Sequence, residues 1–453
     1  MHNIKKIFTI ATILSLAFVN YACGIYREGE TTRIVSPEGN AYTGQTGDEP
    51  SSISTNTTPE SHKKDETMST ESPETEPGPV REPARITFVA AGDNVIHPCI
   101  YMDAKNRATS ETREYNFKPM YEDVVDYIAS FDLAFINQET LMGGADLGYS
   151  GYPCFNSPQD LGLDLIDIGF DIVNIANNHM CDKGQKGLKG TIEFWKSQTD
   201  ITMIGGYSDE TDYNTLRIVE RNGVKIGLLS YTYGTNGISL PASSELVVPY
   251  INDEDIIRQC AQAKEQSDFL IISVHWGNEN QTQVSAEQKR VAKLMAENGA
   301  DVIIGHHPHV LQSIEVIESD YGETLCVYSL GNIVSAMQYW QNMVGGFFSF
   351  DIVADENGNV SFENAAFVPT AFYYGPSYFN SHLYFLRDYP AEKAATHGTK
   401  NLYNNTATPD QMRDYAKKIM GDYLKDYEPA SDNESLRQSD EYFVIINKTF
   451  SRK

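Results

Sequence analysis

Continuous apolar runs of strand length recur along the middle of the chain. They cover residues 86–93, 133–140, 170–179, 201–206, 225–232, 269–277, 301–309, 325–332 and 347–353. Most of these runs are unbroken rather than alternating, which is the pattern of strands that are covered on both faces. Because helical patterns lie between several of them, the chain predicts an α/β body with largely parallel sheets.

Two of the intervening segments have helical patterns. Residues 285–301 begin with Ser285, a candidate N-cap, and Gly299 is a candidate stop. Residues 184–198 form a second helical pattern, although they contain several glycines. These segments supply the helices that an α/β body needs between its strands.

The pattern changes after residue 370. Residues 371–389 are rich in aromatic and turn-forming side chains, and residues 408–427 predict a helix with Thr408 as its cap. We therefore expect a body over residues 84–370 and an accessory region over residues 371–453 that packs on it.

The polar segment before the body is rich in Ser, Thr, Glu, Pro and Gly. It covers residues 24–83 and contains almost no large apolar side chains. A segment of this kind cannot bury enough apolar surface to offset the entropy cost of ordering it. It is predicted to be a disordered tether.

The first residues have the pattern of a signal peptide of the bacterial lipoprotein type. A basic start is followed by an uncharged apolar run over residues 7–19, which is short for a membrane span, and Cys23 follows Ala22. We expect residues 1–23 to direct the chain out of the cytoplasm and Cys23 to carry a lipid anchor in the cell envelope. Simple secretion is the alternative.

Charge and cysteine content exclude several classes of function. The formal net charge of −27 argues against binding to nucleic acid and against electrostatic binding to anionic lipid. An anionic substrate is still possible, because a bound metal ion dominates its local field. Apart from Cys23, the cysteines are widely spaced and form no CxxC pair, so they predict neither a disulfide framework nor a structural zinc site.

Polar side chains stand where several of the apolar runs stop. They are Asp93, Asn137, Glu139, Asn177, Asn178, His179, His275, His306, His307 and His309. In an open α/β sheet, ligands collect at the carboxyl ends of the strands. Carboxylates and imidazoles together suit divalent ions such as Zn, Mn or Fe, and a pair of such ions can activate a water molecule.

Each of these residues has a simpler interpretation when it is taken alone. Asp93 could belong to a turn, and His275 could be a core histidine that is satisfied by its neighbours. The histidine cluster is more informative, because clustered imidazoles are costly to bury without a partner and an apolar strand leads into them. The ordered set is therefore much more specific than any single member.

The same ordered set resembles a known family. The segments that carry the likeness are AAGDNVIH, FINQET, DIVNIANNHMCDKGQKGL, VHWGNE, GADVIIGHHPHVLQ and YSLGNIV. They are similar to the calcineurin-like metallophosphoesterases and, more closely, to the CapA family of poly-γ-glutamate capsule proteins. The likeness covers residues 86–369 and implies a layered α/β/β/α sandwich.

The resemblance also implies roles for individual residues. Asp93 and His309 would bind a first divalent ion, and Glu139 would bridge it to a second. The second ion would be held by three further side chains: Asn178, His275 and His307. His179 would be the general acid that protonates a leaving oxygen, and substrate would be contacted by His97, Asn137, His306 and Glu279.

The chain departs from the pattern of dinuclear phosphoesterases at two positions. Val95 stands where the first site usually has a histidine, with His97 two residues further on, and the bridging acid is Glu139 rather than an aspartate. A single bound ion is therefore an alternative to a pair. Asn177, Asp182, Gln312 and Asn332 are further polar residues that either orient ligands or cap turns.

Three functions remain open at this point. The chain could be a metal-dependent hydrolase, a component of poly-γ-glutamate synthesis or export that handles the polymer without cleaving it, or a nucleotide or phosphodiester hydrolase. Its partners would be the membrane through a lipid anchor, polyglutamate synthase subunits, and an acidic polymer or phosphoester. Retention of His179 favours catalysis, whereas Val95 favours a role other than phosphatase.

Overall fold

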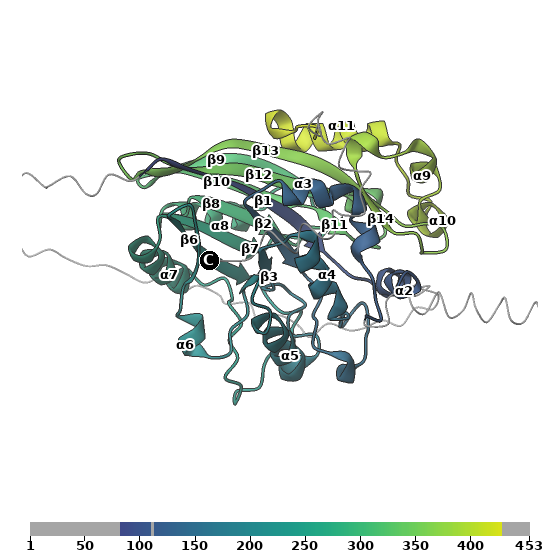
Figure 1. The fold of residues 1–453 in the computed structure, drawn as a ribbon, viewed down its shortest axis with the longest axis horizontal. Helices are drawn as coiled ribbons and strands as arrows, with labels where there is room; N and C mark the ends of the chain where they lie inside the picture. Colours follow the sequence, from purple (N-terminus) through teal and green to yellow (C-terminus); the bar gives the residue numbers. More distant parts are fainter. Residues whose placement is uncertain (1–81, 110–112, 428–453) are drawn as a thin grey trace, which may run out of the picture. The chain divides into compact units, whose positions relative to one another are not determined.

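Two β-sheets form the centre of the molecule. The computed structural model describes residues 82–109 and 113–427. The larger sheet has eight strands in the order β14-β13-β12-β1-β2-β3-β4, with β11 beside β1 (Figure 1). Its strands are β1 (Ala84–Asn94), β2 (Leu133–Gln138), β3 (Ile172–Asn174), β4 (Thr202–Ile204), β11 (Asn332–Val334), β12 (Val344–Ala354), β13 (Val360–Tyr373) and β14 (His382–Phe385).

The smaller sheet has six strands in the order β5-β6-β7-β8-β10-β9. They are β5 (Arg217–Arg221), β6 (Val224–Thr232), β7 (Phe269–His275), β8 (Val302–His306), β9 (Leu311–Ser319) and β10 (Gly322–Leu330). Strands β1 to β4 run parallel to one another, as do β6, β7, β8 and β10. The antiparallel strands lie at the flanks, so the expected parallel pattern holds for the middle of each sheet.

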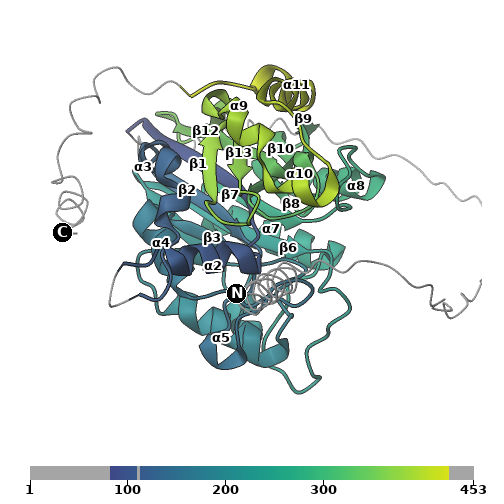
Figure 2. The same ribbon diagram turned by 90° about the vertical axis from the view of Figure 1, so that its right-hand side faces the viewer.

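The two sheets pack face to face and helices cover their outer faces. Inward-facing side chains such as Phe88, Phe135, Ile226 and Ile304 meet in one apolar core. A second core lies between the smaller sheet and the helices α7 (Asp253–Gln266) and α8 (Ala286–Ala296). Helices α3 (Val125–Ala129) and α4 (Asp160–Ile168) lie on the opposite side of the paired sheets (Figure 2). The expected α/β/β/α sandwich is therefore confirmed.

The remaining helices connect the strands or lie in the C-terminal region. They are α2 (Pro98–Asn106), α5 (Gly184–Lys196), α6 (Glu210–Tyr213), α9 (Ala391–Ala395), α10 (Gly398–Tyr403) and α11 (Pro409–Met420). The sequence signals for α5, α8 and α11 are confirmed. Ser285 and Thr408 each form a capping box with the glutamine at the third helical position, a feature that contributes about 1 kcal/mol per cap.

The C-terminal region shares its core with the body. Strand β13 runs through residue 370, so the boundary expected there falls inside a single strand. Met412, Ala416 and Met420 on α11 join the core between the sheets. The backbone N–H of Leu311 donates a hydrogen bond to the Tyr415 hydroxyl at 3.2 Å. Helix α11 thus packs beside β9, the strand that begins two residues after His309.

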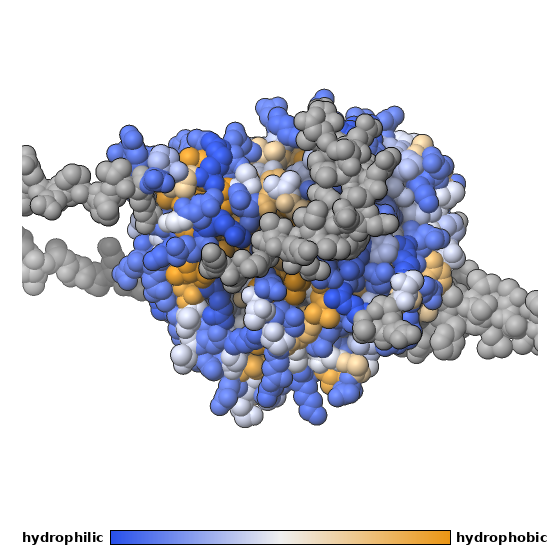
Figure 3. Space-filling view, viewed as in Figure 1, coloured by the Kyte–Doolittle hydropathy of each residue, from blue (hydrophilic) through white to orange (hydrophobic). Residues whose placement is uncertain are grey.

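The expected signal peptide, Cys23 and most of the expected tether lie outside the described residues. Within the described residues, no helix is both long and apolar enough to cross a membrane. The face seen in Figure 3 is mostly hydrophilic, and apolar side chains appear there in small scattered groups. This surface fits the large negative net charge of the chain.

His397 gives the C-terminal region a dependence on pH. Its imidazole is buried, Nε2 donates to the carbonyl of Phe372 at 3.1 Å, and Nδ1 accepts from the Thr399 N–H at 3.1 Å. Burial lowers the pKa of His397 to about 4, partly offset by the bond to Phe372. Between pH 6.5 and this pKa, the unfolded chain binds a proton that the folded chain does not, so stability falls as pH falls.

We expect the His397→Asn variant to lose less stability in acid than the wild type. Asparagine keeps an N-cap acceptor and does not titrate. Between pH 7 and pH 4.5 the wild type should lose about 2 kcal/mol more of its free energy of unfolding than the variant does. Urea unfolding in the presence of a chelator measures this difference. Equal losses in both proteins would show that His397 does not carry the effect.

Candidate metal centre

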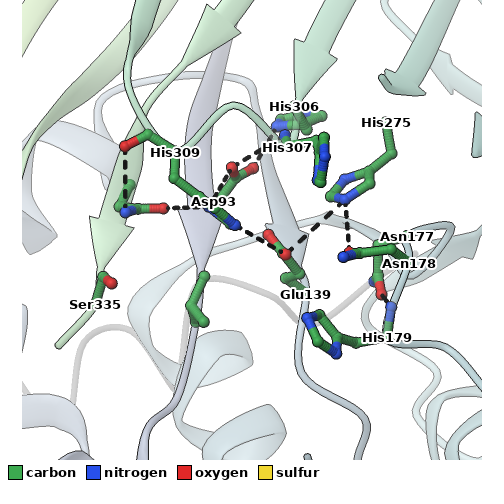
Figure 4. A network of polar contacts seen from close by, with 12 residues as sticks. Asp93, Glu139, Asn177, Asn178, His179, His275, His306, His307, His309 and Ser335 are labelled. Atoms are coloured by element: carbon green, nitrogen blue, oxygen red, sulfur yellow. Dashed lines mark hydrogen bonds and ion pairs between the residues drawn. The ribbon is translucent and has the colours of Figure 1, made fainter. Parts of the chain in front are cut away.

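The carboxyl ends of strands from both sheets meet at one edge of the sandwich. Asp93 at the end of β1 lies opposite Asn137 on β2 and Asn332 on β11, and His275 on β7 lies opposite His306 on β8. Figure 4 shows the resulting cluster, with Glu139 between Asp93 and His275. Parallel pairing in register therefore brings together residues that are far apart in the chain.

The turn after β8 folds back over Asp93. His307 and His309 have φ angles of 97° and 57°, in the left-handed region that such residues seldom adopt. The backbone N–H of His307 donates to Asp93 Oδ2 at 3.1 Å. This unusual backbone presents the imidazoles of His307 and His309 to the same edge, and it is the kind of strain that is found at functional sites.

Asp93 is fully buried and strongly hydrogen-bonded. Asn137 Nδ2 donates to Oδ1 at 2.8 Å, His306 Nδ1 lies 3.0 Å from the same oxygen, and His309 Nδ1 lies 3.2 Å from Oδ2. Burial by itself raises the pKa of Asp93, but the contacts with His306 and His309 outweigh burial and hold this pKa well below its usual range. Asp93 is therefore a carboxylate with fixed orientation.

Glu139 is also fully buried, but neither of its carboxylate oxygens makes a hydrogen bond to a described residue. His309 Nε2 lies 3.4 Å and His275 Nε2 3.9 Å from Oε1, which are loose ion-pair distances. Burial raises the pKa of Glu139 well above its usual value, and His309 opposes this only in part. An unpaired buried carboxylate is costly, and a cation between these groups would remove the cost.

A further set of ligands stands on the other side of Glu139. His275 Nε2 lies 2.9 Å from Asn178 Oδ1, and the rings of His275 and His307 lie 4.8 Å apart. The Nδ1 atoms of both histidines are buried and make no hydrogen bond to any described residue. Burial lowers the pKa of His307 to about 3 and that of His275 well below its usual value. Neutral imidazoles of this kind are the form that binds metal ions.

The donor set fits two cation positions that share one carboxylate. Among the described residues, three groups have possible ligand atoms within 4.8 Å of one another. The groups are Asp93, Glu139 and His309; Glu139, His275 and His307; and Glu279, His307 and His309. Carboxylates with imidazoles suit Mn, Zn or Fe. The first two groups coincide with the ligands that the sequence resemblance implies, and Glu139 is common to both.

His309 connects the two carboxylates. Although burial disfavours its charged form, Glu139 and Asp93 raise the pKa of His309 to about 10. Its Nδ1 also lies 2.9 Å from Asn332 Oδ1, and Asn332 was one of the polar residues of open role in the sequence. In the metal-free protein, the positive charge of protonated His309 therefore offsets part of the negative charge of Asp93 and Glu139, as a bound cation would.

His179 lies beside the cluster in an arrangement that suits proton transfer. Its Nδ1 lies 2.8 Å from Asp182 Oδ2, and its ring meets the ring of Phe155 edge-on at 4.7 Å. The Phe155 N–H donates to the same Asp182 oxygen at 2.6 Å. A carboxylate at Nδ1 fixes the orientation of the ring and leaves Nε2 for a reacting group.

The expected substrate contacts occupy different places. Asn137 and His306 are fully buried behind Asp93, so they orient this carboxylate rather than reach a substrate. Glu279 is exposed and lies within reach of His307 and His309. His97 accepts the Ala336 N–H at 3.2 Å on its Nδ1 and belongs to none of the three ligand groups. Its pKa is lowered to about 4 by burial.

Several residues of the site had not been singled out in the sequence. Asn174 Nδ2 donates to Asn137 Oδ1 at 2.8 Å and so supports the chain of amides behind Asp93. The Tyr233 ring lies tilted against the His307 ring with centroids 4.6 Å apart, and Asn236 contacts Asn178 and His179. Tyr233 and Asn236 follow the end of β6. The strand-end rule that located the other ligands could therefore have located them too.

Comparison with known proteins supports one family. The family model described as "Bacterial capsule synthesis protein PGA_cap" matches residues 87–337. The capsule biosynthesis protein CapA of Bacillus anthracis is 34% identical over 172 residues, which cover 37% of this chain and 41% of that protein. The PGA biosynthesis protein CapA of Bacillus subtilis is 37% identical over 181 residues, which cover 38% of this chain and 44% of that protein.

The match spans about two fifths of the length of these two relatives. Among solved structures, the NAD nucleotidase of Haemophilus influenzae aligns with a TM-score of 0.41 at 12% identity and covers 77% of this chain and 58% of its own. A putative 5'-nucleotidase from Staphylococcus aureus aligns with a TM-score of 0.40 at 15% identity and covers 74% of this chain and 59% of its own.

Proposed function

Because the chain belongs to the family of bacterial capsule synthesis proteins, we propose that it acts in the synthesis or export of capsular poly-γ-glutamate. The names of the two CapA relatives support this proposal. The working part of the protein is a divalent-metal centre at the strand ends. The observation that carries the centre is Glu139, a buried carboxylate that makes no hydrogen bond to any described residue and belongs to two groups of possible ligands.

One or two ions of Mn, Zn or Fe would be held by this chain. Asp93 and His309 would hold the first ion, and Glu139 would contact both. The second ion would be held by three side chains: Asn178, His275 and His307. When bound, such ions polarise the bond to be cleaved and lower the pKa of water. Val95 leaves the first position one histidine short, so the second position has the fuller set of ligands.

Hydrolysis is the chemistry that the site supports best. His179 is not needed to hold an ion, yet it is kept beside the centre and paired with Asp182 at 2.8 Å. In this role the protonated imidazole donates from Nε2 to the leaving atom, and Asp182 stabilises the charge on the ring. The bond cleaved is an amide of the γ-linked glutamate polymer. A phosphoester outside the cell is the alternative substrate.

The proposed place of action is the outer side of the cell envelope. Cys23 would carry the lipid anchor, residues 24–83 would act as a tether, and polyglutamate synthase subunits would be the partners. Support for this part comes from the pattern of the N-terminal sequence alone. Labelling of cells with a radioactive fatty acid tests it, because a Cys23→Ala variant should then carry no label.

Metal content and substrate are tested together on the purified full chain. Elemental analysis should find one or two equivalents of divalent ion, or gain them after Mn or Zn is added. The loaded protein is then incubated with γ-linked glutamate polymer and with a panel of phosphoesters. Absence of any bound ion after loading would contradict the metal centre. Cleavage of phosphoesters alone would favour the alternative substrate.

A further inference from the structure

Asn236, in the loop after β6, contacts the metal centre through its side chain. Asn236 lies in this loop with a φ angle of 52° and is solvent-exposed as a residue. Its Oδ1 accepts a hydrogen bond from Asn178 Nδ2 at 3.2 Å, and its Nδ2 lies 3.5 Å from His179 Nδ1. An exposed asparagine thus contacts both a proposed metal ligand and the proposed general acid.

The contact with Asn236 favours one of the two orientations of the Asn178 amide. A side-chain amide has one oxygen and one nitrogen, and only the oxygen binds a divalent cation. Asn178 Oδ1 points to His275 Nε2 at 2.9 Å, which leaves the NH2 group on the side of Asn236. Because Asn236 offers an acceptor there, rotation of the amide would lose this bond and place two donors against the cation.

The loop holds Asn236 firmly in this position. The Tyr233 N–H donates to the carbonyl of His275 at 2.9 Å, and the Tyr233 ring lies tilted against the His307 ring. Thr235 Oγ1 donates to the carbonyl of Ile238 at 2.7 Å and lies 3.0 Å from the Tyr250 hydroxyl. Asparagine tolerates a positive φ angle better than most residues, so the backbone is compatible with this placement.

We propose that Asn236 is a positioning residue of the metal centre, whose side-chain oxygen sets the amide of Asn178 so that its oxygen faces the second ion. This inference rests on the proposed function, because it needs an ion at Asn178, His275 and His307. It adds that the loop over residues 233–250 influences how tightly the second ion is bound. Partners of metal ligands of this kind typically change metal affinity by about 10- to 100-fold when they are removed.

Two substitutions separate the effect of the side chain from that of the backbone. Asn236→Gly keeps the positive φ angle and removes the acceptor, whereas Asn236→Asp keeps both the φ angle and an acceptor. Asn222→Gly is the matched control, since Asn222 has a φ angle of 50° in the turn between β5 and β6. Each full chain is titrated with Mn²⁺ without substrate, and Co²⁺ absorption reports the coordination of the bound ion.

Asn236→Gly should lower the affinity for one bound ion by about 10-fold or more and change the Co²⁺ spectrum. The metal affinities of Asn236→Asp and Asn222→Gly should stay within about 3-fold of the wild type, because both variants keep an oxygen at position 236 that accepts from Asn178 Nδ2. Unchanged affinity for every ion in Asn236→Gly would overturn the inference, as would equal weakening in Asn236→Gly and Asn236→Asp. A wild type that binds no ion would instead overturn the proposed function itself.

Discussion

Glu139→Gln should abolish tight binding of divalent ions while the protein stays folded. Glu139 lies in two of the three groups of possible ligands, so its loss removes a charged ligand from both cation positions. Glutamine has nearly the same shape but no charge, and metal affinity should fall by more than about 100-fold, beyond the usual effect of an indirect partner. The measurement is elemental analysis together with titration by Mn²⁺ and Zn²⁺.

In the metal-free protein, the same substitution should increase the free energy of unfolding. Because the pKa of Glu139 is raised in the folded state, the unfolded chain releases this proton at lower pH than the folded chain does. The contribution of Glu139 to the stability of the metal-free wild type therefore falls as pH rises above about 4.3, until the folded pKa is passed. The variant does not titrate there, so at pH 8 its free energy of unfolding should exceed that of the wild type by about 1 to 2 kcal/mol.

Thermal unfolding with chelator and with excess metal measures both effects. Metal should raise the melting temperature of the wild type strongly and that of the Glu139→Gln variant little. Glu297→Gln is a suitable control, since Glu297 is a surface residue whose partner is Lys293 at 3.3 Å. A Glu139→Gln variant that binds ions as tightly as the control would show that Glu139 is no ligand.

His179→Ala should leave metal binding intact and reduce hydrolysis by about 10²- to 10⁴-fold, the usual contribution of a general acid. His179 is in none of the three ligand groups, and its Nδ1 is engaged with Asp182. Loss of the ring therefore removes the proton donor without opening a cation position. The readout is kcat on the substrate that the panel identifies, measured beside the metal content of the same preparation.

Asp182→Asn tests how the pair works. The amide keeps the shape of Asp182 but not its charge, so kcat should fall by less than in His179→Ala and metal content should stay unchanged. His382→Ala is the matched histidine control, because His382 pairs with Asp123 at 2.9 Å on the surface and belongs to none of the ligand groups. Wild-type kcat in His179→Ala would remove His179 from the mechanism.

The central strands of both sheets could be predicted from the sequence because buried strands consist of continuous apolar runs. Strands covered on both faces need apolar side chains at every position, and this produced recognisable runs for β1, β6, β7 and β8. The flanking strands β5 and β9 alternate between half-buried and exposed positions, so they gave no comparable run. The boundary expected at residue 370 falls inside β13, which extends the sheet of the body into the C-terminal region.

The sequence by itself determined the α/β class, the polar residues that end the strands, and the capped helices, because each of these depends on neighbours within a few residues. Only the tertiary structure decided which of those residues meet and which way they face. Asp93 and His306 are 213 positions apart, and Asn178 and His275 are 97 positions apart. Such contacts arise from the pairing and packing of whole sheets. The same packing placed Asn137 and His306 behind Asp93 and brought Asn236 to Asn178.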